Sequence, residues 1–356
     1  MTISVCMGIY QGARYLEEQL LSILHQTRPA DEVILCDDGS KDRTVELVRE
    51  FIREHHLEKK WKLYCNEKNK GYPGNFYYAM SLCSMDVVFL ADQDDIWDVH
   101  KLERMTPILQ ERKDVKAVCC KFGLVDASGA DIHSIMAPAR SRGTGSLRNI
   151  SIEDVFYKCE WPGMVVAYRG EWYRKRLEVW KQRFMEPDNR ESGSAEQDRE
   201  LSGRNTMPKQ GAGPAEHGTA KESYPQGLPH DFLICAWAAE EGAFLQLDEE
   251  LAYHRRHDAN TGGEEHRIAR LLNRERKLAE IQNYLKILDI FEECHVLREN
   301  RSKQALADKK RVMEQRDEAL RSGKISRVLA NAWHNRKETR LATAVCDAVI
   351  AAKKGG

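Results

Sequence analysis

The chain has 356 residues, of which 42% are hydrophobic and 31% charged, and its net charge is -1. This length suffices for one large domain with an appendage or for two domains. A nearly neutral chain has no overall field that would attract nucleic acid, so we expect no nucleic-acid partner. Its ten cysteines are scattered without a CxxC pair, so their spacing does not indicate a zinc site. Scattered cysteines of this kind favour a protein of the reducing cytoplasm. No secretory leader or membrane span is apparent.

Apolar runs alternate with helical periodicity through the first hundred residues. Four short strands are predicted at 3–7, 32–36, 61–65 and in the apolar start of 86–97. Helices are predicted between them at 13–26, 43–55 and 76–82, with 66–75 as a loop. Strands that alternate with helices in this way are typical of a parallel sheet with crossover helices.

Two of these strands end in carboxylates. The second is followed by Asp37 and Asp38, and the fourth by Asp92, Asp94 and Asp95. Parallel strands bring their carboxyl ends to one edge of the sheet, which is where ligands bind in open α/β folds. Clustered carboxylates favour a hard divalent cation shared with a phosphate. The alternatives are an acidic turn capping a helix and, for Asp38, a turn with an N-cap.

The middle of the chain continues the pattern and then breaks it. A helix is predicted at 101–112, a strand at 117–122, a turn at 126–129 and a polar loop at 137–149. A turn leads into a strand over 161–168, and a helix follows at 171–185. Residues 186–229 then have almost no aliphatic side chains, which predicts a disordered insertion or a mobile loop.

Order resumes with an apolar helix over 230–239 that holds Asp231 in its first turn. There an acid also suits the helix dipole without any further role. A strand at 243–247 leads to a basic, glycine-ended loop over 253–263. Such a loop suits an anion such as a diphosphate, or is simply a solvated polar loop.

From residue 264 onward the sequence predicts charged helices. Residues 321–356 carry eight basic and two acidic side chains, an excess of six positive charges. Ile325, Val328, Leu329 and Trp333 recur at helical spacing in the same stretch. A basic amphipathic helix with a tryptophan is typical of attachment to an anionic membrane surface. The alternative is packing on the domain or on a second copy of the chain, as in a homo-oligomer.

Several motifs together resemble family 2 glycosyltransferases of the GT-A fold, a Rossmann-like α/β class with a mostly parallel central sheet flanked by helices. The resemblance covers residues 1–263 apart from the insertion, and is nearest to bacterial enzymes that build cell-surface polysaccharides, including rhamnosyltransferase-like members. The matching segments are 5–20, 22–27, Asp37-Asp38-Gly39-Ser40-Lys41-Asp42, Asn69-Lys70-Gly71-Tyr72, Asp92-Gln93-Asp94-Asp95-Ile96-Trp97, His230-Asp231 and Arg255-Arg256-His257. Gln11 stands where the family commonly has asparagine.

The resemblance implies a role for each matched position. Tyr10 and Asp38 would contact the nucleotide base with Asp37 nearby, and Asn69 and Gly71 would border the nucleotide-sugar. The remaining implied roles are metal ligands on the diphosphate at Asp92 and Asp94, diphosphate or metal contacts at Arg255, Arg256 and His257, the general base at Asp231, and the acceptor border at Trp161, Pro162 and Gly163.

We therefore expect an inverting glycosyl transfer that depends on Mn²⁺ or Mg²⁺. The donor would be a UDP- or dTDP-linked sugar, and the acceptor a glycan or a lipid-linked glycan. Residues 1–263 would form the catalytic domain and residues 264–356 a helical extension. The alternatives are a non-catalytic sugar-nucleotide-binding or scaffold protein and a nucleotidyltransferase. The latter lacks support because no glycine-rich, lysine-containing loop lies near the N-terminus.

Overall fold

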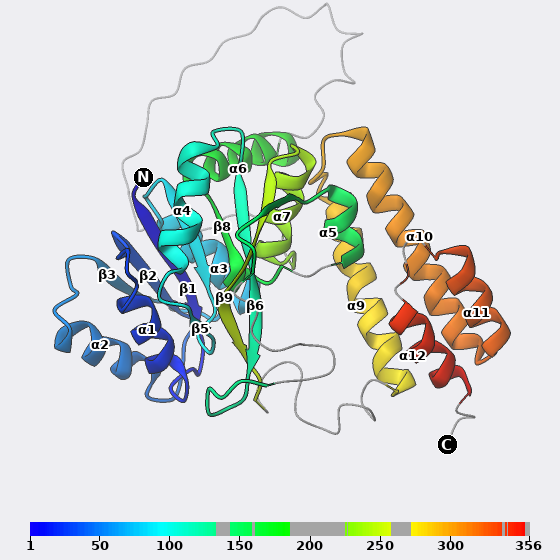
Figure 1. Cartoon of the computed structure of the whole chain (residues 1–356), viewed down its shortest axis with the longest axis horizontal. Coiled ribbons are helices and arrows are strands. Elements are labelled where there is room, and N and C mark those ends of the chain that lie inside the picture. Colours follow the sequence, from blue (N-terminus) through cyan, green and yellow to red (C-terminus); the bar gives the residue numbers. More distant parts are fainter. Residues whose placement is uncertain are drawn as a thin grey trace, which may run out of the picture.

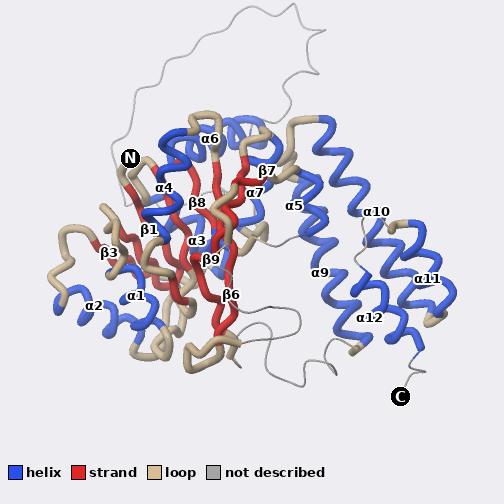
Figure 2. The backbone as a smooth tube through the Cα atoms, in the orientation of Figure 1, coloured by secondary structure: helices blue, strands red, loops and turns tan. Residues whose placement is uncertain are grey.

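The computed structural model describes residues 1–132, 143–158, 161–185, 225, 227–257, 272–336, 339 and 341–352. A nine-stranded sheet in the order β3-β2-β1-β4-β8-β6-β9-β5, with β7 paired to β9, forms the centre of the molecule. Helices flank this sheet, and the last four helices form a further layer at one end of it (Figures 1 and 2). The expected α/β class with a C-terminal helical extension is confirmed.

The first half of the sheet is parallel, as predicted. Its strands and helices alternate as β1 (Ile3–Ile9), α1 (Leu16–Leu24), β2 (Glu32–Asp37), α2 (Thr44–Glu54), β3 (Trp61–Cys65), α3 (Gly71–Leu82) and β4 (Val87–Ala91). Strands β1 and β4 are almost wholly buried, which explains their unbroken apolar sequences. The prediction of a loop over 66–75 was wrong for its second half, because Pro73 lies in the first turn of α3, where no backbone N–H is needed.

The second half of the sheet is mixed. It contains β5 (Ile96–Trp97), β6 (Ala117–Val125), β7 (Leu147–Asn149), β8 (Val166–Arg169) and β9 (Phe244–Arg255), with α4 (Lys101–Glu111), α5 (Ile152–Lys158), the 3-10 turn η1 (Gly163–Val165), α6 (Gly170–Met185) and α7 (His230–Glu240) between them. Strand β8 runs antiparallel to both β4 and β6, and β9 runs parallel to β6. The sheet is therefore mostly parallel only on its N-terminal side.

Strand β9 extends well past the predicted 243–247. Tyr253 and Arg255 pair with Gly123 and Val125 of β6, so they lie in the strand and not in a loop. Neither β7 nor α5 was predicted. The short helix α5 buries Ile152, Val155 and Phe156 against the core. A stretch of seven residues is too short for its periodicity to stand out in the sequence.

The predicted helical C-terminus is confirmed as α9 (Arg274–Glu293), α10 (Asn300–Ser322), α11 (Ile325–His334) and α12 (Leu341–Ala352). Leu288 and Phe291 of α9 and Leu306 of α10 belong to the main hydrophobic core. A second, smaller core joins all four helices, and its larger members are Ile281, Leu285, Met313, Leu320, Val328 and Ile350. The extension is therefore packed on the sheet domain at one end only, and the division at residue 263 stays a prediction.

Three sequence predictions fall largely outside the described residues. They are the insertion over 186–229, of which only 225 and 227–229 are described, the loop beyond His257, and the first part of the 137–149 loop. Of the helices that the structure describes, none combines the length and the apolar character that a membrane crossing needs.

Candidate functional site

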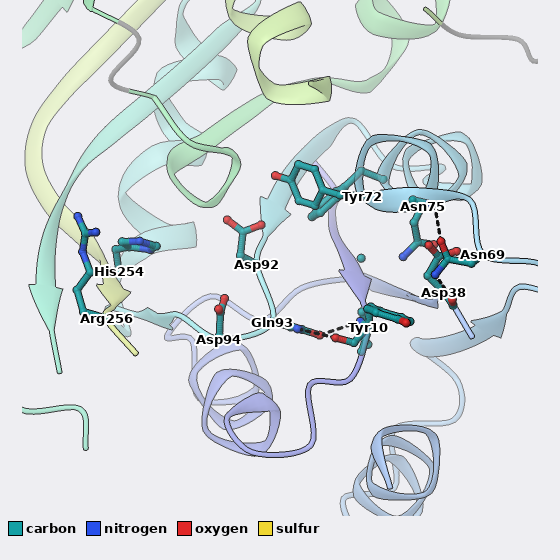
Figure 3. Close-up of a pocket in the computed structure, with 14 residues that line it drawn as sticks. Tyr10, Asp38, Asn69, Tyr72, Asn75, Asp92, Gln93, Asp94, His254 and Arg256 are labelled. Atoms are coloured by element: carbon teal, nitrogen blue, oxygen red, sulfur yellow. Dashed lines mark hydrogen bonds between the residues drawn. The ribbon is translucent and has the colours of Figure 1, made fainter. Parts of the chain in front are cut away.

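A cavity of about 740 Å³ lies where β1, β2 and β4 end, and Figure 3 shows its lining side chains. Strand ends that lie far apart in the sequence meet here, as the parallel arrangement predicts. Seven of the predicted site residues line it: Tyr10, Asp38, Asn69, Gly71, Asp92, Asp94 and Arg256. Asp37, Arg255, His257, Trp161, Gly163 and Asp231 are not among its lining residues.

One side of the cavity is built around Asp38, which is buried at the end of β2. Its Oδ1 accepts hydrogen bonds from Asn66 Nδ2 and from the Lys70 backbone N–H, both at 2.8 Å. Asn69 Nδ2 donates to the backbone oxygen of Asp38 at 2.9 Å. The loop before α3 is thereby held against β2 by side-chain amides. This side of the cavity has its polar groups in place without any added ligand.

Asp37 has a different role in the structure. Its Oδ2 accepts the backbone N–H groups of Gly39 and Ser40, both at 3.0 Å, and its side chain is buried. Gly39 has a φ of 84°, a left-handed conformation that glycine adopts at little cost. Asp37 therefore shapes the turn that follows β2 and does not line the cavity, and its role near the nucleotide stays a prediction.

Gln93 ties the two sides of the cavity together. Its Oε1 accepts the Tyr10 backbone N–H at 2.9 Å and its Nε2 donates to the Tyr10 backbone oxygen at 3.0 Å. The position of this amide requires glycine at residue 12, because a Cβ there would collide with the Gln93 side chain. The exposed rings of Tyr10 and Tyr72 stand at the cavity.

The other side of the cavity is acidic, and Figure 3 shows Asp92 and Asp94 pointing into it. Burial, followed by the charges of Asp95 and Asp94, raises the pKa of Asp92 well above its ordinary value. The pKa of Asp94 is raised by burial and by Asp95, and is opposed by a hydrogen bond to His257. Carboxylates placed this close favour an added cation, because only an opposite charge stabilises all of their ionised forms.

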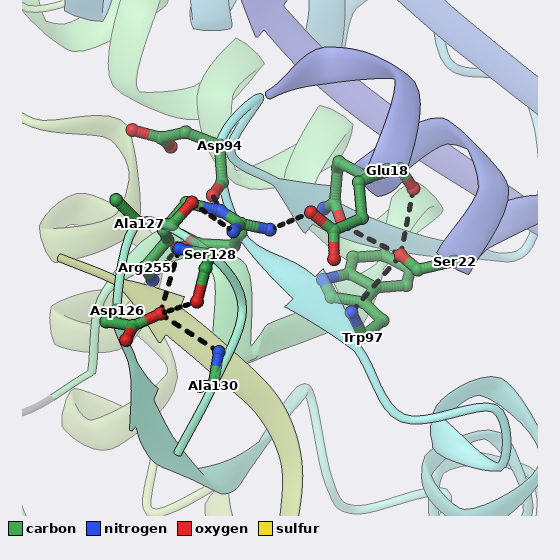
Figure 4. A network of polar contacts seen from close by, with 11 residues as sticks. Glu18, Ser22, Asp94, Trp97, Asp126, Ala127, Ser128, Ala130 and Arg255 are labelled. Atoms are coloured by element: carbon green, nitrogen blue, oxygen red, sulfur yellow. Dashed lines mark hydrogen bonds and ion pairs between the residues drawn. The ribbon is translucent and has the colours of Figure 1, made fainter. Parts of the chain in front are cut away.

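Two histidines and an arginine near the end of β9 surround these carboxylates. His257 Nε2 lies 3.0 Å from Asp94 Oδ2, and His254 Nδ1 lies 3.0 Å from Asp95 Oδ1. Arg255 is buried and turned away from the cavity: it donates to the Asp94 backbone oxygen and the Ala127 backbone oxygen and pairs with Glu18 (Figure 4). Of the two adjacent arginines, Arg256 is therefore the one that lines the cavity.

A divalent cation such as Mn²⁺ or Mg²⁺ requires several ligand atoms, mainly oxygens, around one point. The part of the chain that the structure describes contains no preassembled group of three His, Cys, Asp or Glu side chains around one point. Asp94 and His257 form a pair, and Asp92 opens on the same cavity as Asp94. Two carboxylates with raised pKa values and one imidazole fit Mn²⁺ or Mg²⁺ chemically, if phosphate and water oxygens complete the coordination.

The predicted acceptor side lies next to this acidic side. Asp231, in the first turn of α7, lines a smaller apolar cavity of about 270 Å³ together with Trp161, Pro162, Phe232 and Tyr284. The charge of Asp231 contributes to the raised pKa of Asp92, so the two carboxylates are close enough to interact. A Cβ on Gly163 would lie 3.2 Å from His230 Nε2 and 3.8 Å from Asp231 Cβ, so η1 passes directly over the start of α7.

His230, which precedes Asp231, is fully buried, and neither ring nitrogen has a hydrogen-bond partner. Its ring stacks on Phe76 with centroids 3.9 Å apart. Burial lowers the pKa of His230 to about 4, so the ring is neutral at physiological pH. The residue therefore packs the base of α7 as an aromatic ring and does not supply a charge.

Sequence reasoning did not identify several residues of the site. Gln93 and Tyr72 belong to the matching motifs and His254 to the predicted 253–263 loop, but none of them was assigned a role. Lys101 was counted only as a helix start, yet it is buried, lies over the Trp97 ring at 3.7 Å and donates to the Met164 backbone oxygen. Burial lowers the pKa of Lys101 to about 8. The one signal for Lys101 in the sequence was its position four residues after a tryptophan, Trp97.

Residues 4–159 match the family model described as Glycosyl transferase family 2. An uncharacterized glycosyltransferase of Nostoc sp. is 30% identical over 173 residues, covering 48% of this chain and 52% of that protein. The Escherichia coli UDP-Glc:alpha-D-GlcNAc-diphosphoundecaprenol beta-1,3-glucosyltransferase WfgD is 34% identical over 101 residues, covering 28% and 38%.

The putative glycosyltransferase EpsE of Bacillus subtilis is 32% identical over 116 residues, covering 33% of this chain and 41% of that protein. The chain thus spans about half, or less, of the length of these three relatives. The solved structure of S. aureus TarS 1-349 in complex with UDP-GlcNAc aligns with a TM-score of 0.49 at 13% identity, over 99% of this chain and 91% of that one. The family match covers β1 to α5, the segment that contributes most of the residues lining the cavity.

Proposed function

We propose that the protein transfers a sugar from a nucleotide-diphospho-sugar, UDP- or dTDP-linked, to a glycan or lipid-linked glycan, with inversion at the anomeric carbon. The observation that carries this proposal is that three groups with different properties lie next to one another. A cavity side with satisfied amides surrounds Asp38, a crowded acidic side follows β4, and a separate carboxylate, Asp231, interacts electrostatically with Asp92.

The donor would lie across the cavity, with its base between Tyr10 and Asp38 and its diphosphate toward Asp92 and Asp94. Asn69 and Gly71 would border the nucleotide, as the resemblance implies, and Arg256 and His254 would face the diphosphate. Asp92, Asp94 and His257 would hold Mn²⁺ or Mg²⁺. When bound, this ion stabilises the charge that develops on the leaving diphosphate.

Asp231 would accept the proton of the acceptor hydroxyl. It is half-buried, and its Oδ1 accepts the Phe232 backbone N–H at 2.8 Å, which leaves Oδ2 for a substrate. A base supplied by a different element from the diphosphate-binding loop suits a single displacement from the face opposite the leaving group. Trp161 and Gly163 would border the acceptor, whose apolar face suits the small cavity beside Asp231.

A lipid-linked acceptor is proposed by analogy with WfgD, whose name specifies a diphosphoundecaprenol-linked substrate. None of the nine cysteines that the structure describes forms a disulfide, which favours a cytoplasmic site of action. We propose a peripheral position at the inner face of the cell membrane, with a homo-oligomer as the competing use of the C-terminal helices.

The test is a donor screen followed by one matched pair of variants. The protein is incubated with Mn²⁺ or Mg²⁺ and a panel of UDP-, dTDP- and GDP-sugars, and released nucleoside diphosphate is measured. Asp231→Asn should abolish transfer while donor binding, measured by calorimetry, is retained. Glu241→Gln, at the other end of α7, is the control and should leave both unchanged. Donor binding without turnover by the wild-type chain on any acceptor would favour the scaffold alternative, and near-normal turnover of Asp231→Asn would refute the assigned base.

A further inference from the structure

The outward side of helix α12 is wholly apolar. Its exposed residues are Leu341, Ala342, Val345, Val349 and Ala352, and none of them is polar. Leu341 is 81% exposed, and the larger residues recur every four positions, which places them along one stripe. The only ionisable acid of the helix, Asp347, faces inward, where Arg316 binds it through two hydrogen bonds of 2.6 and 2.9 Å. A helix exposed only to water would carry polar residues on this side.

Helix α11 adds a second stripe with the same spacing. Ile325, Leu329 and Trp333 are exposed, Trp333 by 74%, whereas Val328 turns inward to the smaller core. The sequence grouped Val328 with the other three, and the structure separates it from them. Of the eleven large hydrophobic residues that are exposed in the described chain, six lie on these two helices. Two more, Tyr10 and Tyr72, line the donor cavity. An apolar surface this concentrated marks an interaction site.

Basic residues accompany both stripes. Lys324, Arg327 and Arg336 are exposed around α11, and the Arg336 guanidinium lies 5.3 Å from the centroid of the Trp333 ring. In the sequence, Arg340 directly precedes α12 and Lys353 and Lys354 directly follow it. An exposed tryptophan and aliphatic stripe with flanking lysine and arginine is the pattern of a helix that lies in the headgroup region of an anionic bilayer.

We infer that α11 and α12 form a docking surface for an anionic lipid membrane. A second copy of the chain is the competing occupant of an apolar face. Lys324, Arg327 and Arg336 are exposed beside the apolar residues of α11, and two faces that carry these positive charges would repel each other. An anionic surface attracts the same charges while it accepts the apolar side chains.

The position of this surface suits the proposed acceptor. Through the smaller core, α11 and α12 are packed on α10 and α9, and α9 supplies Tyr284 and Ile287 to the cavity beside Asp231. Tyr284 Oη also donates to the Phe156 backbone oxygen of α5 at 2.7 Å. A membrane bound at α11 and α12 is therefore connected through packed helices to the acceptor side. In Figure 1 these helices lie at the end of the molecule away from α2 and β3.

The experiment is vesicle co-sedimentation of the full chain, without donor or acceptor, so that its outcome is independent of glycosyl transfer. Phosphatidylcholine vesicles are compared with vesicles that contain about 30% phosphatidylglycerol, and we expect binding at least roughly tenfold tighter to the anionic ones. The triple variant Leu329→Ser, Trp333→Ser, Leu341→Ser should lose binding by about tenfold or more. The matched control replaces three exposed aliphatic residues elsewhere, Val99→Ser, Leu147→Ser and Val179→Ser, and should bind as the wild type does.

A second variant, Lys324→Gln, Arg327→Gln, Arg336→Gln, separates charge from apolar contact and should weaken binding to anionic vesicles only. Circular dichroism and donor hydrolysis check that every variant is folded. Equal binding to both vesicle types, or equal losses in the test and control triples, would overturn the inference. A chain that ignores vesicles and forms a dimer that the first triple variant dissociates would also overturn it, in favour of a second copy.

Discussion

The two sides of the cavity at the ends of β1, β2 and β4 contain the same kind of side chain in opposite electrostatic situations. Near β2, the carboxylates of Asp37 and Asp38 each accept two hydrogen bonds to a single oxygen. After β4, Asp92 and Asp94 lie within range of each other and of Asp95, and the pKa of both is raised. N–H donors surround the carboxylates of the first pair. In the second group, burial and the neighbouring negative charges dominate, even though His257 lies against Asp94.

This difference separates shape from charge. A carboxylate that accepts backbone and amide N–H groups stabilises a loop conformation, so the Asp38 side is formed by the chain alone. Crowded carboxylates destabilise the fold slightly and are completed by a cation. Substitutions on the first side should therefore reduce the stability of the protein, and those on the second side should reduce its activity.

The largest effect is expected for Asp94→Ala. Transfer should fall by roughly a thousandfold, because the variant lacks a proposed ligand of the metal ion that would stabilise the leaving group. The midpoint of thermal unfolding in EDTA should stay unchanged or rise, since one of several like charges is removed. Steady-state kinetics and calorimetry of the same preparation measure both quantities. A clear drop in thermal stability would mean that the acidic side is as structural as the Asp38 side.

His230, which stacks on Phe76 of the cavity lining, should make the stability of the protein depend on pH. Its pKa is about 4 in the folded protein against an ordinary value of 6.5, so the unfolded chain binds the proton more readily. The contribution is complete above pH ~6.5 and is lost as the pH falls toward 4, by about 3 kcal/mol in total. Urea titrations across this range should show a flatter pH profile for His230→Phe than for the wild type. Parallel profiles would exclude this histidine as the cause.

Asp38→Ala is expected to destabilise the protein by about 2 kcal/mol, because Asn66 Nδ2 and the Lys70 backbone N–H lose their acceptor. The KM for the donor should rise more than kcat falls, since the loop that borders the base is released. Urea denaturation and donor-dependence curves measure the two effects. Asp42→Ala, on the same connection but exposed to water, is the comparison and should cost less. Equal stability of Asp38→Ala and the wild type would contradict the conclusion that the Asp38 side of the cavity is formed by the chain alone.

The smallest expected effect belongs to the connection between the sides. Gln93→Ala removes both hydrogen bonds to the Tyr10 backbone and should cost about 1 kcal/mol of stability, with a rise of several-fold in the KM for the donor. Gln93→Glu keeps the acceptor but adds a negative charge beside the Tyr10 backbone, on the residue that joins Asp92 to Asp94, so its kcat should fall further than that of the alanine variant. If both variants behave alike in initial-rate assays, the charge on this side matters less than proposed.

Much of this arrangement could be predicted from the sequence because it is local. The apolar runs that end in Asp37 and Asp92 define strands whose carboxyl ends meet, and the structure confirms that meeting. Residues whose role depends on distant partners were less predictable. Arg255 belonged to a basic motif, yet its contact with Glu18 of α1 turns it from the cavity, and no local pattern indicates that contact.

The same limit applies to Lys101 and to the start of α7. Lys101 is buried by the β5 tryptophan, four residues earlier in the chain, and by η1, which only the folded sheet brings to α4. His230 is a stacked aromatic ring because Phe76 of α3 lies against it. In contrast, the spacing of the apolar residues predicts the apolar side of α12, and the structure adds that Asp347 faces inward.

The irregular pairing of β9 with β6 has a consequence for changes in chain length. Cys119 pairs with Gln246 but Val125 pairs with Arg255, so β9 uses three residues more than β6 over this interval. Since alternate residues of a strand face opposite sides, an odd surplus reverses the parity of everything beyond it. A deletion of one residue between 247 and 251 would exchange the orientations of His254 and Arg255. The guanidinium would then point toward Asp95 and the imidazole toward Glu18. Point substitutions between residues 247 and 251 should therefore be far better tolerated than the deletion of a single residue.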